Sequence, residues 1–191
     1  MIDLVLAARL TTSPSRAAAY LAHAADEARH AKMFSAHARE WAERAGLDAL
    51  PPVRADVEHL FESLGETAFL ALVHRGERHG RADFEVYRAQ FERRGEHKTV
   101  ALFDAVLVDE RRHEARSREM LLAVAGSELA ARRALRFAAL RATWRAWLRL
   151  GRGMGRALYA ALASVLYVLA APIALAVRIA QPARSGFVRT R

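Results

Sequence analysis

Residues 26–30 read Asp-Glu-Ala-Arg-His, and residues 109–113 read Asp-Glu-Arg-Arg-His. Both follow the pattern D-E-x-R-H. Two copies of this pattern would arise by chance in fewer than about one in 10⁴ chains of this length and composition. Residues three apart lie on one face of an α-helix, so each Glu and the following His can bind one metal ion or two neighbouring ions. The repeat therefore predicts a metal site built from two helices.

Apolar residues around these pentapeptides recur with the 3.6-residue period of amphipathic helices. In the third predicted helix, Gly76 and Gly80 are positions where we expect loosening. Short connections between long helices favour antiparallel neighbours, which predicts an all-α, four-helix bundle with a short first helix. The predicted helices cover residues 2–10, 14–45, 56–94 and 98–125.

Helix-breaking residues mark the expected ends. Ser13 and Pro14 are typical of the N-cap and the first position of a helix. Gly46 and Gly126 each follow a predicted helix, as C-terminal capping glycines do. Two prolines at residues 51–52 predict a loop.

The glutamates of both pentapeptides interrupt apolar stripes. Glu27 falls between Ala24 and Phe34 on its helix, and Glu110 has a similar apolar setting. An unpaired carboxylate in a bundle core costs several kcal/mol, and bound cations remove that cost. Metal binding explains this placement better than the alternative, in which both glutamates are solvated helix charges.

A further carboxylate is expected from the helix before Gly95. Glu77 lies 18 residues before this turn and Glu110 lies 15 after it, which places them at a similar level of two antiparallel helices. Glu66 shares a face with Glu77 three turns earlier and is the runner-up.

The partner of Glu27 from the first helix is harder to find. Antiparallel packing places it near residue 1 or upstream, and Asp3 is the one acidic residue there. Three alternatives follow: Asp3 is a short substitute ligand, one metal position is impaired, or the natural first helix begins upstream of Met1.

The two E-x-x-H motifs, Glu27 with His30 and Glu110 with His113, resemble those of the ferritin-like di-iron carboxylate superfamily. The resemblance covers about the first 125 residues and implies a ferritin-like bundle that binds two iron ions, with manganese as the alternative metal. Together with Glu77, these four side chains are the expected ligands.

The same resemblance implies roles for two aspartates. Asp26 and Asp109 each precede a motif glutamate, and in the superfamily such an aspartate often hydrogen-bonds the histidine of the opposite motif. His23 and His37 are expected to lie outside the metal site.

Composition excludes several classes of protein. The chain has 191 residues, 53% of them hydrophobic, and no cysteine, so a disulfide framework and a thiolate metal site are excluded. The net charge of +9 arises from residues 129–191, which hold 12 arginines and no acidic residue. Residues 1–128 hold 18 basic and 21 acidic side chains, so we expect no nucleic-acid partner.

The C-terminal third predicts membrane association. We divide the chain into a bundle over residues 1–126, a basic amphipathic helix over 127–156, and a hydrophobic membrane-anchor helix with a basic tail over 157–191. Residues 157–177 carry no charge and at ~1.5 Å per residue can cross a hydrocarbon core, whereas their many alanines and Pro172 leave a re-entrant or interfacial arrangement as the alternative. Eight arginines precede this stretch and four follow it, which places the bundle on the cytoplasmic side. The apolar start at residues 2–8 is too short for a secretory signal.

Three functional hypotheses follow. The first is a membrane-associated di-iron oxidoreductase that uses O₂ on a lipid-soluble substrate, such as a quinone or an acyl chain. The second is a rubrerythrin-like protein that handles iron or peroxide, and the third is a metal-poor ferritin-like scaffold. An apolar cavity beside the metals would favour the first, and a narrow polar channel the second. The sequence does not identify the electron donor. The protein could act as a monomer or as a homodimer.

Overall fold

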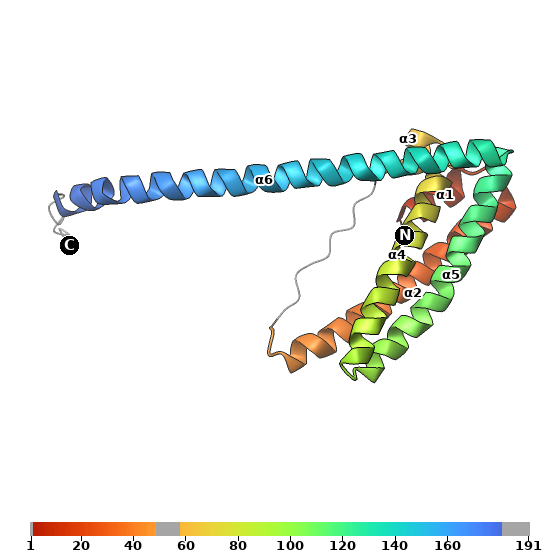
Figure 1. Cartoon of the computed structure of the whole chain (residues 1–191), viewed down its shortest axis with the longest axis horizontal. Helices are drawn as coiled ribbons and strands as arrows, with labels where there is room; N and C mark the ends of the chain where they lie inside the picture. The colour runs from red at the N-terminus through yellow and green to blue at the C-terminus, as the bar shows by residue number, and fades with distance from the viewer. Residues whose placement is uncertain (1, 49–57, 181–191) are drawn as a thin grey trace, which may run out of the picture. The chain divides into compact units, whose positions relative to one another are not determined.

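A computed structural model describes residues 2–48 and 58–180, and within these ranges the chain is helical and has no strand (Figure 1). The predicted all-α class is confirmed. The short first helix packs along α2, and α4 packs along α5, while α2 also contacts α5. The helices are α1 (Ile2–Leu10), α2 (Pro14–Arg44), α3 (Leu60–Leu64), α4 (Glu66–Arg93), α5 (His97–Ala125) and α6 (Glu128–Ala180).

The expected ends of α2 and α5 are confirmed. The Ser13 hydroxyl accepts a hydrogen bond from the Arg16 backbone N–H at 3.4 Å, and Pro14 is the first helical residue. Gly46 and Gly126 follow the helices with φ of 68° and 71°, a left-handed conformation that favours glycine. The loop expected at residues 51–52 lies outside the described residues.

The helix expected over residues 56–94 is wrong in its continuity. Gly65, with φ 78° and ψ 164°, separates the short α3 from α4. A residue with a side chain rarely adopts this conformation, so glycine turns the chain here. The loosening expected at Gly76 and Gly80 is also wrong, because α4 runs through both. The first two residues of the expected helix lie outside the described ranges.

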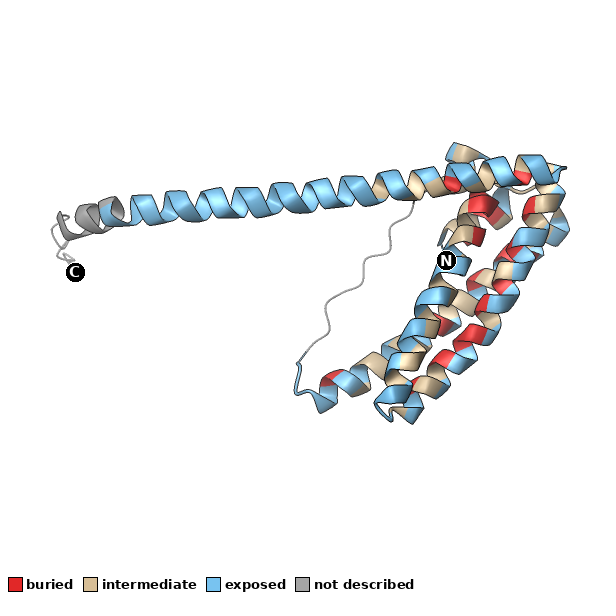
Figure 2. Cartoon of the chain, viewed as in Figure 1, coloured by how far each residue is buried: buried red, intermediate tan, exposed pale blue. Residues whose placement is uncertain are grey.

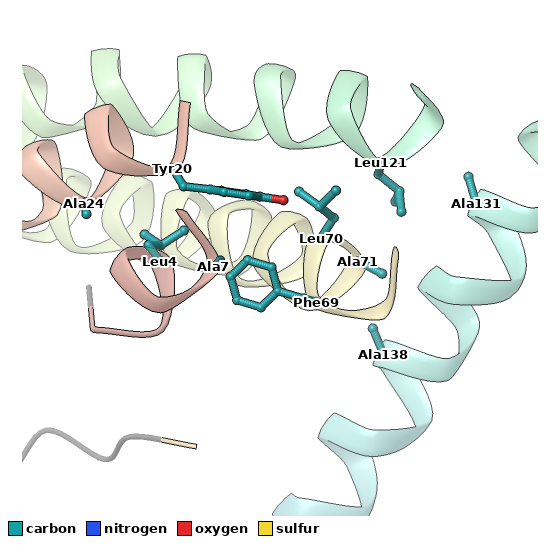
Figure 3. Close-up of a cluster of buried hydrophobic side chains, with 10 residues drawn as sticks. All are labelled: Leu4, Ala7, Tyr20, Ala24, Phe69, Leu70, Ala71, Leu121, Ala131 and Ala138. Atoms are coloured by element: carbon teal, nitrogen blue, oxygen red, sulfur yellow. The ribbon is translucent and has the colours of Figure 1, made fainter. Parts of the chain in front are cut away.

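The hydrophobic core lies at one end of the bundle and joins five helices (Figure 3). Tyr20 and Phe69 pack edge to face, with ring centroids 5.7 Å apart. The start of α6 belongs to this core through Ala131 and Ala138, which are 3% and 0% exposed. The buried cluster contains Leu4, Ala7, Tyr20, Ala24, Phe69, Leu70, Ala71, Leu121, Ala131 and Ala138.

Helix α6 is continuous across the segments that we expected to separate at residue 157, and it continues past Pro172 to Ala180. The chain divides within this helix into two compact units, Met1–Arg141 and Ala142–Arg191. Side chains of residues 146–172 are exposed along its whole circumference (Figure 2). Within the described ranges, α6 is the one helix long and apolar enough to cross a membrane.

Candidate metal centre

Three helices bring the five expected ligand side chains together. Glu27 and His30 lie on α2, Glu77 on α4, and Glu110 and His113 on α5. Their ligand atoms form two overlapping groups, and within each group all ligand atoms lie within 4.8 Å of one another. Glu27 belongs to both groups, so its carboxylate could contact a metal ion in either one.

The first group contains a histidine that we expected to lie outside the site. His23 joins Glu27, Glu77 and His113, and its Nε2 lies 3.1 Å from Glu77 Oε1 and 3.6 Å from Glu27 Oε1. His23 precedes Glu27 by four residues, so one helical turn places both on one face of α2. That spacing, H-x-x-x-E-x-x-H, could have identified His23 from the sequence.

The second group is smaller and contains Glu27, His30 and Glu110. His30 Nδ1 lies 3.7 Å from Glu110 Oε1 and 3.9 Å from Glu27 Oε1. Glu110 and His30 are 5% and 4% exposed, so this group lies in the bundle interior.

The outer nitrogens of two histidines are held by aspartates of the opposite motif, in the pairing that the resemblance implied. His113 Nε2 lies 3.0 Å from Asp26 Oδ2, and His30 Nε2 lies 3.0 Å from Asp109 Oδ2. An ionised carboxylate can only accept, so in each pair the imidazole Nε2–H donates. Each Nδ1 is then left with a lone pair directed at the cluster, as a metal-binding histidine requires.

Two arginines of the pentapeptides hold these aspartates in place. Arg112 Nη2 lies 2.7 Å from both Asp26 Oδ2 and Asp109 Oδ1. Arg29 pairs with the same two aspartates from the other side, at 2.7 Å from Asp26 Oδ1. Burial would raise the pKa of Asp26, but His113 and the arginines lower it to about 2. Both carboxylates therefore stay ionised and act as acceptors at neutral pH.

Unsatisfied nitrogen atoms test whether these residues fit a metal. His113 Nδ1 and His23 Nε2 are buried and make no well-formed hydrogen bond with the described residues, although oxygens of Glu77 lie 3.6 and 3.1 Å away. A buried polar group without a partner is costly. Two imidazole nitrogens and several carboxylate oxygens suit Fe²⁺ or Mn²⁺, so the donor set fits the expected metals.

Without metal, protonation reduces the negative charge of the cluster. Burial raises the pKa of Glu110 to about 8, together with the negative charges of Glu77 and Glu27. Burial alone would lower the pKa of His23, but Glu27 and Glu77 raise it to about 9. Burial would raise the pKa of Glu77, yet the neighbouring imidazoles of His113 and His23 lower it to about 2. At neutral pH, Glu110 and His23 therefore carry protons in the places where metal ions would bring positive charge.

The runner-up ligands lie outside both groups. Glu66 accepts hydrogen bonds from Thr11, Arg16 and Tyr20, with Arg16 Nε at 2.7 Å. It therefore ties the α1–α2 connection to the start of α4. Asp3 accepts weak bonds of 3.4 Å from the backbone N–H groups of residues 58 and 60. Helix α1 thus supplies no member of either group, whereas α2 supplies His23 to the first group.

A cavity of about 360 Å³ opens beside the cluster between α1, α3 and α4. Glu27, Glu77 and Glu110 form one part of its wall, and Asp3 lies in the wall at another point. His23 and two glycines also line the cavity, and the remaining side chains are apolar: Leu4, Leu60, Phe69, Leu72, Val73 and Phe84.

A second, larger cavity of about 580 Å³ lies toward the α4–α5 turn. Phe34 and Phe103 line it, and both pack against Phe84 of the first cavity, with ring centroids 5.5 and 5.7 Å apart. A layer of three phenylalanines thus separates the two cavities.

Comparison with known proteins identifies one family. The family described as Rubrerythrin matches residues 4–121, which include every residue of both ligand groups. No curated protein and no solved structure gives a match.

Proposed function

The chain belongs to the rubrerythrin family of ferritin-like, iron-binding proteins, and from this premise we propose that it is a membrane-associated di-iron oxidoreductase that uses O₂ on a lipid-soluble substrate. Two bound irons would supply reversible ferrous–ferric redox chemistry, and the protein's own residues position the metals and admit the substrate.

The cavity beside the cluster, with an apolar part of its wall opposite the carboxylates, is the observation that carries this proposal. Substrate pockets are usually apolar concavities with a few polar groups that fix orientation. Here Leu4, Phe69 and Phe84 face a space that also contacts the carboxylates of Glu27 and Glu110. A small apolar group could enter this space and lie next to the metals, whereas peroxide alone would need no such lining.

The residues around the cluster have separate tasks in this proposal. Asp26 and Asp109 fix the orientation of His113 and His30, so that the imidazoles are ready to bind metal. In the metal-free cluster the carboxyl group of Glu110 holds a proton at neutral pH, and metal binding would displace this proton. The phenylalanine layer excludes water from one side of the site.

The second candidate function is iron or peroxide handling, which the family match itself favours. We distinguish the two with the reduced, iron-loaded full chain in detergent, mixed in separate experiments with O₂ and with hydrogen peroxide. The oxidoreductase proposal expects O₂ consumption to continue beyond a single oxidation of the iron when a reduced quinone analogue is present, because the analogue supplies electrons. Peroxide handling would be favoured if peroxide oxidised the bound iron rapidly, O₂ oxidised it slowly, and the quinone analogue had no effect on the reaction with O₂.

Membrane association is proposed from α6, with the bundle on the cytoplasmic side because arginines are more frequent before the apolar stretch. Trp144 and Trp147 are both 65% exposed and lie among arginines, as in helices that meet a lipid surface. We expect full-length protein to need detergent. Recovery of the full chain in the high-salt soluble fraction without detergent would contradict membrane association.

A truncation tests the same proposal and uses the boundary in the structure. Removing residues 142–191 should release a soluble bundle that keeps its metal. Removing residues 128–191 should instead destabilise the bundle, because Ala131 and Ala138 belong to its core. Equal stability of the two truncated proteins, measured by thermal unfolding, would contradict this division.

A further inference from the structure

A strongly basic pocket of about 390 Å³ lies in the unit Met1–Arg141 and shares no residue with the ligand groups. Helices α4, α5 and the start of α6 contribute its walls. No acidic side chain lines it. Its charged or titratable residues are His74, Arg75, Arg78, His79, Arg118 and Arg136.

Most of the positive charge in this pocket is uncompensated. Among the residues that the structure describes, Arg75, Arg78 and Arg136 have no carboxylate within 4.0 Å. Arg118 meets Glu128 at 3.6 Å, but both side chains are about half exposed. By contrast, Arg81 on the same α4 pairs with Glu114 at 2.6 Å and with Glu85 at 2.8 Å. Acidic partners are therefore present nearby and are absent from the pocket.

The inner wall of the pocket is fixed by a buried histidine. His74 is 6% exposed, and its Nδ1 lies 3.1 Å from the backbone carbonyl of Glu114 and 3.2 Å from Ser117 Oγ. A carbonyl oxygen can only accept, so Nδ1–H donates and the ring orientation is set. His74 thus fixes the inner wall of the pocket, while Arg78, His79, Arg118 and Arg136 are exposed around it.

We propose that this pocket binds a phosphate group. Arg75, Arg78 and His79 follow the i, i+3, i+4 spacing of one face of α4, and Arg118 and Arg136 approach from two other helices. Guanidinium groups bind phosphate oxygens with paired, charge-assisted hydrogen bonds. The volume suits a small molecule or headgroup. The phosphate comes either from a soluble phosphate compound or from the headgroup of a membrane lipid.

The test uses the full chain in a nonionic detergent and two probes. Inorganic pyrophosphate is titrated calorimetrically as the soluble probe. Mixed micelles that contain phosphatidic acid are titrated as the lipid probe, with phosphatidylcholine micelles as their reference. We expect saturable binding of at least one probe, with affinity reduced about tenfold or more in Arg78→Gln and in Arg75→Gln.

Arg93→Gln is the matched control, because Arg93 is exposed on the same helix, outside the pocket, and loses the same charge. Binding of pyrophosphate alone identifies a soluble ligand, and binding of phosphatidic acid alone identifies a lipid headgroup. The proposal is overturned if neither probe binds, or if Arg93→Gln weakens binding as much as the pocket variants. Thermal unfolding of each variant shows whether a loss of binding reflects a loss of fold.

Discussion

The two halves of the metal centre start from the same pentapeptide and end with different ligand sets. On α5, His113 faces Glu77 and His23, so four side chains surround one position. On α2, His30 faces Glu110, and with the shared Glu27 only three side chains surround the other. The pentapeptide sets the orientation of each histidine through an aspartate, whereas the neighbouring helices set the number of ligands. We therefore expect two metal positions of unequal affinity.

The largest effect is expected where the halves overlap. Glu27→Gln removes the one charge that both positions share, so we expect iron content to fall from about two per chain to well below one. Glu43→Gln, an exposed change near the end of the same helix, serves as control. Elemental analysis of both proteins provides the measurement, and an iron content in Glu27→Gln equal to that of the control would contradict a shared ligand.

The halves should be separable by their histidines. We expect His23→Ala to abolish the tighter phase of a ferrous or cobaltous titration and His30→Ala to abolish the weaker phase, each lowering affinity by about 100-fold or more. His97→Ala, at an exposed position, should leave both phases intact. If His23→Ala leaves the tighter phase unchanged, His23 is not a ligand and the halves are more alike than their geometry indicates.

A smaller effect is expected from the aspartates behind the histidines. Asp26→Asn should weaken the tighter position by about 10-fold to 100-fold, and Asp109→Asn should do the same to the weaker one. Neutral asparagine holds each imidazole less firmly in the required tautomer. The exposed Asp83→Asn provides the control. Identical effects of both changes on both phases, in the same titration, would show that the network acts as one unit.

The smallest effect is a release of protons. Glu110 has a pKa raised to about 8 and His23 a pKa raised to about 9, so both are protonated in the metal-free protein at pH 7. Metal binding needs both unprotonated, so about two protons should leave at pH 7, and affinity should rise as pH increases toward 9. Calorimetry in buffers of different ionisation enthalpy counts these protons. Glu110→Gln should release about one fewer, and proton uptake on binding would contradict the charge balance.

The long helices could be predicted from the sequence because their periodicity and caps are local features. Ser13 with Pro14 and the glycine after α5 mark ends that depend on a few adjacent residues. Gly65 was missed because a single glycine interrupts the periodicity of α3 and α4 without a loop. The position of α6 in the core also depends on tertiary packing, since Ala131 and Ala138 are unremarkable in a basic segment.

The pattern of the site shows the same limit. Glu77 and Glu110 could be placed by counting residues from the Gly95 turn, because residues at similar distances before and after a turn lie side by side in antiparallel helices. His23 was missed because we expected the missing ligand on the first helix, whereas His23 lies on α2, the helix of Glu27. The role of Glu66 depends on hydrogen bonds from Arg16 and Tyr20. These residues are far from Glu66 in the sequence, so helical spacing could not predict the contacts.

The central claim is that two metal ions lie on either side of Glu27. Anomalous diffraction at the iron edge, from crystals of the iron-loaded full chain, tests it most directly. We expect two peaks, one in contact with His23, Glu77 and His113 and the other in contact with His30 and Glu110. A peak at Glu66 or Asp3, or no peak within the cluster, would contradict the account.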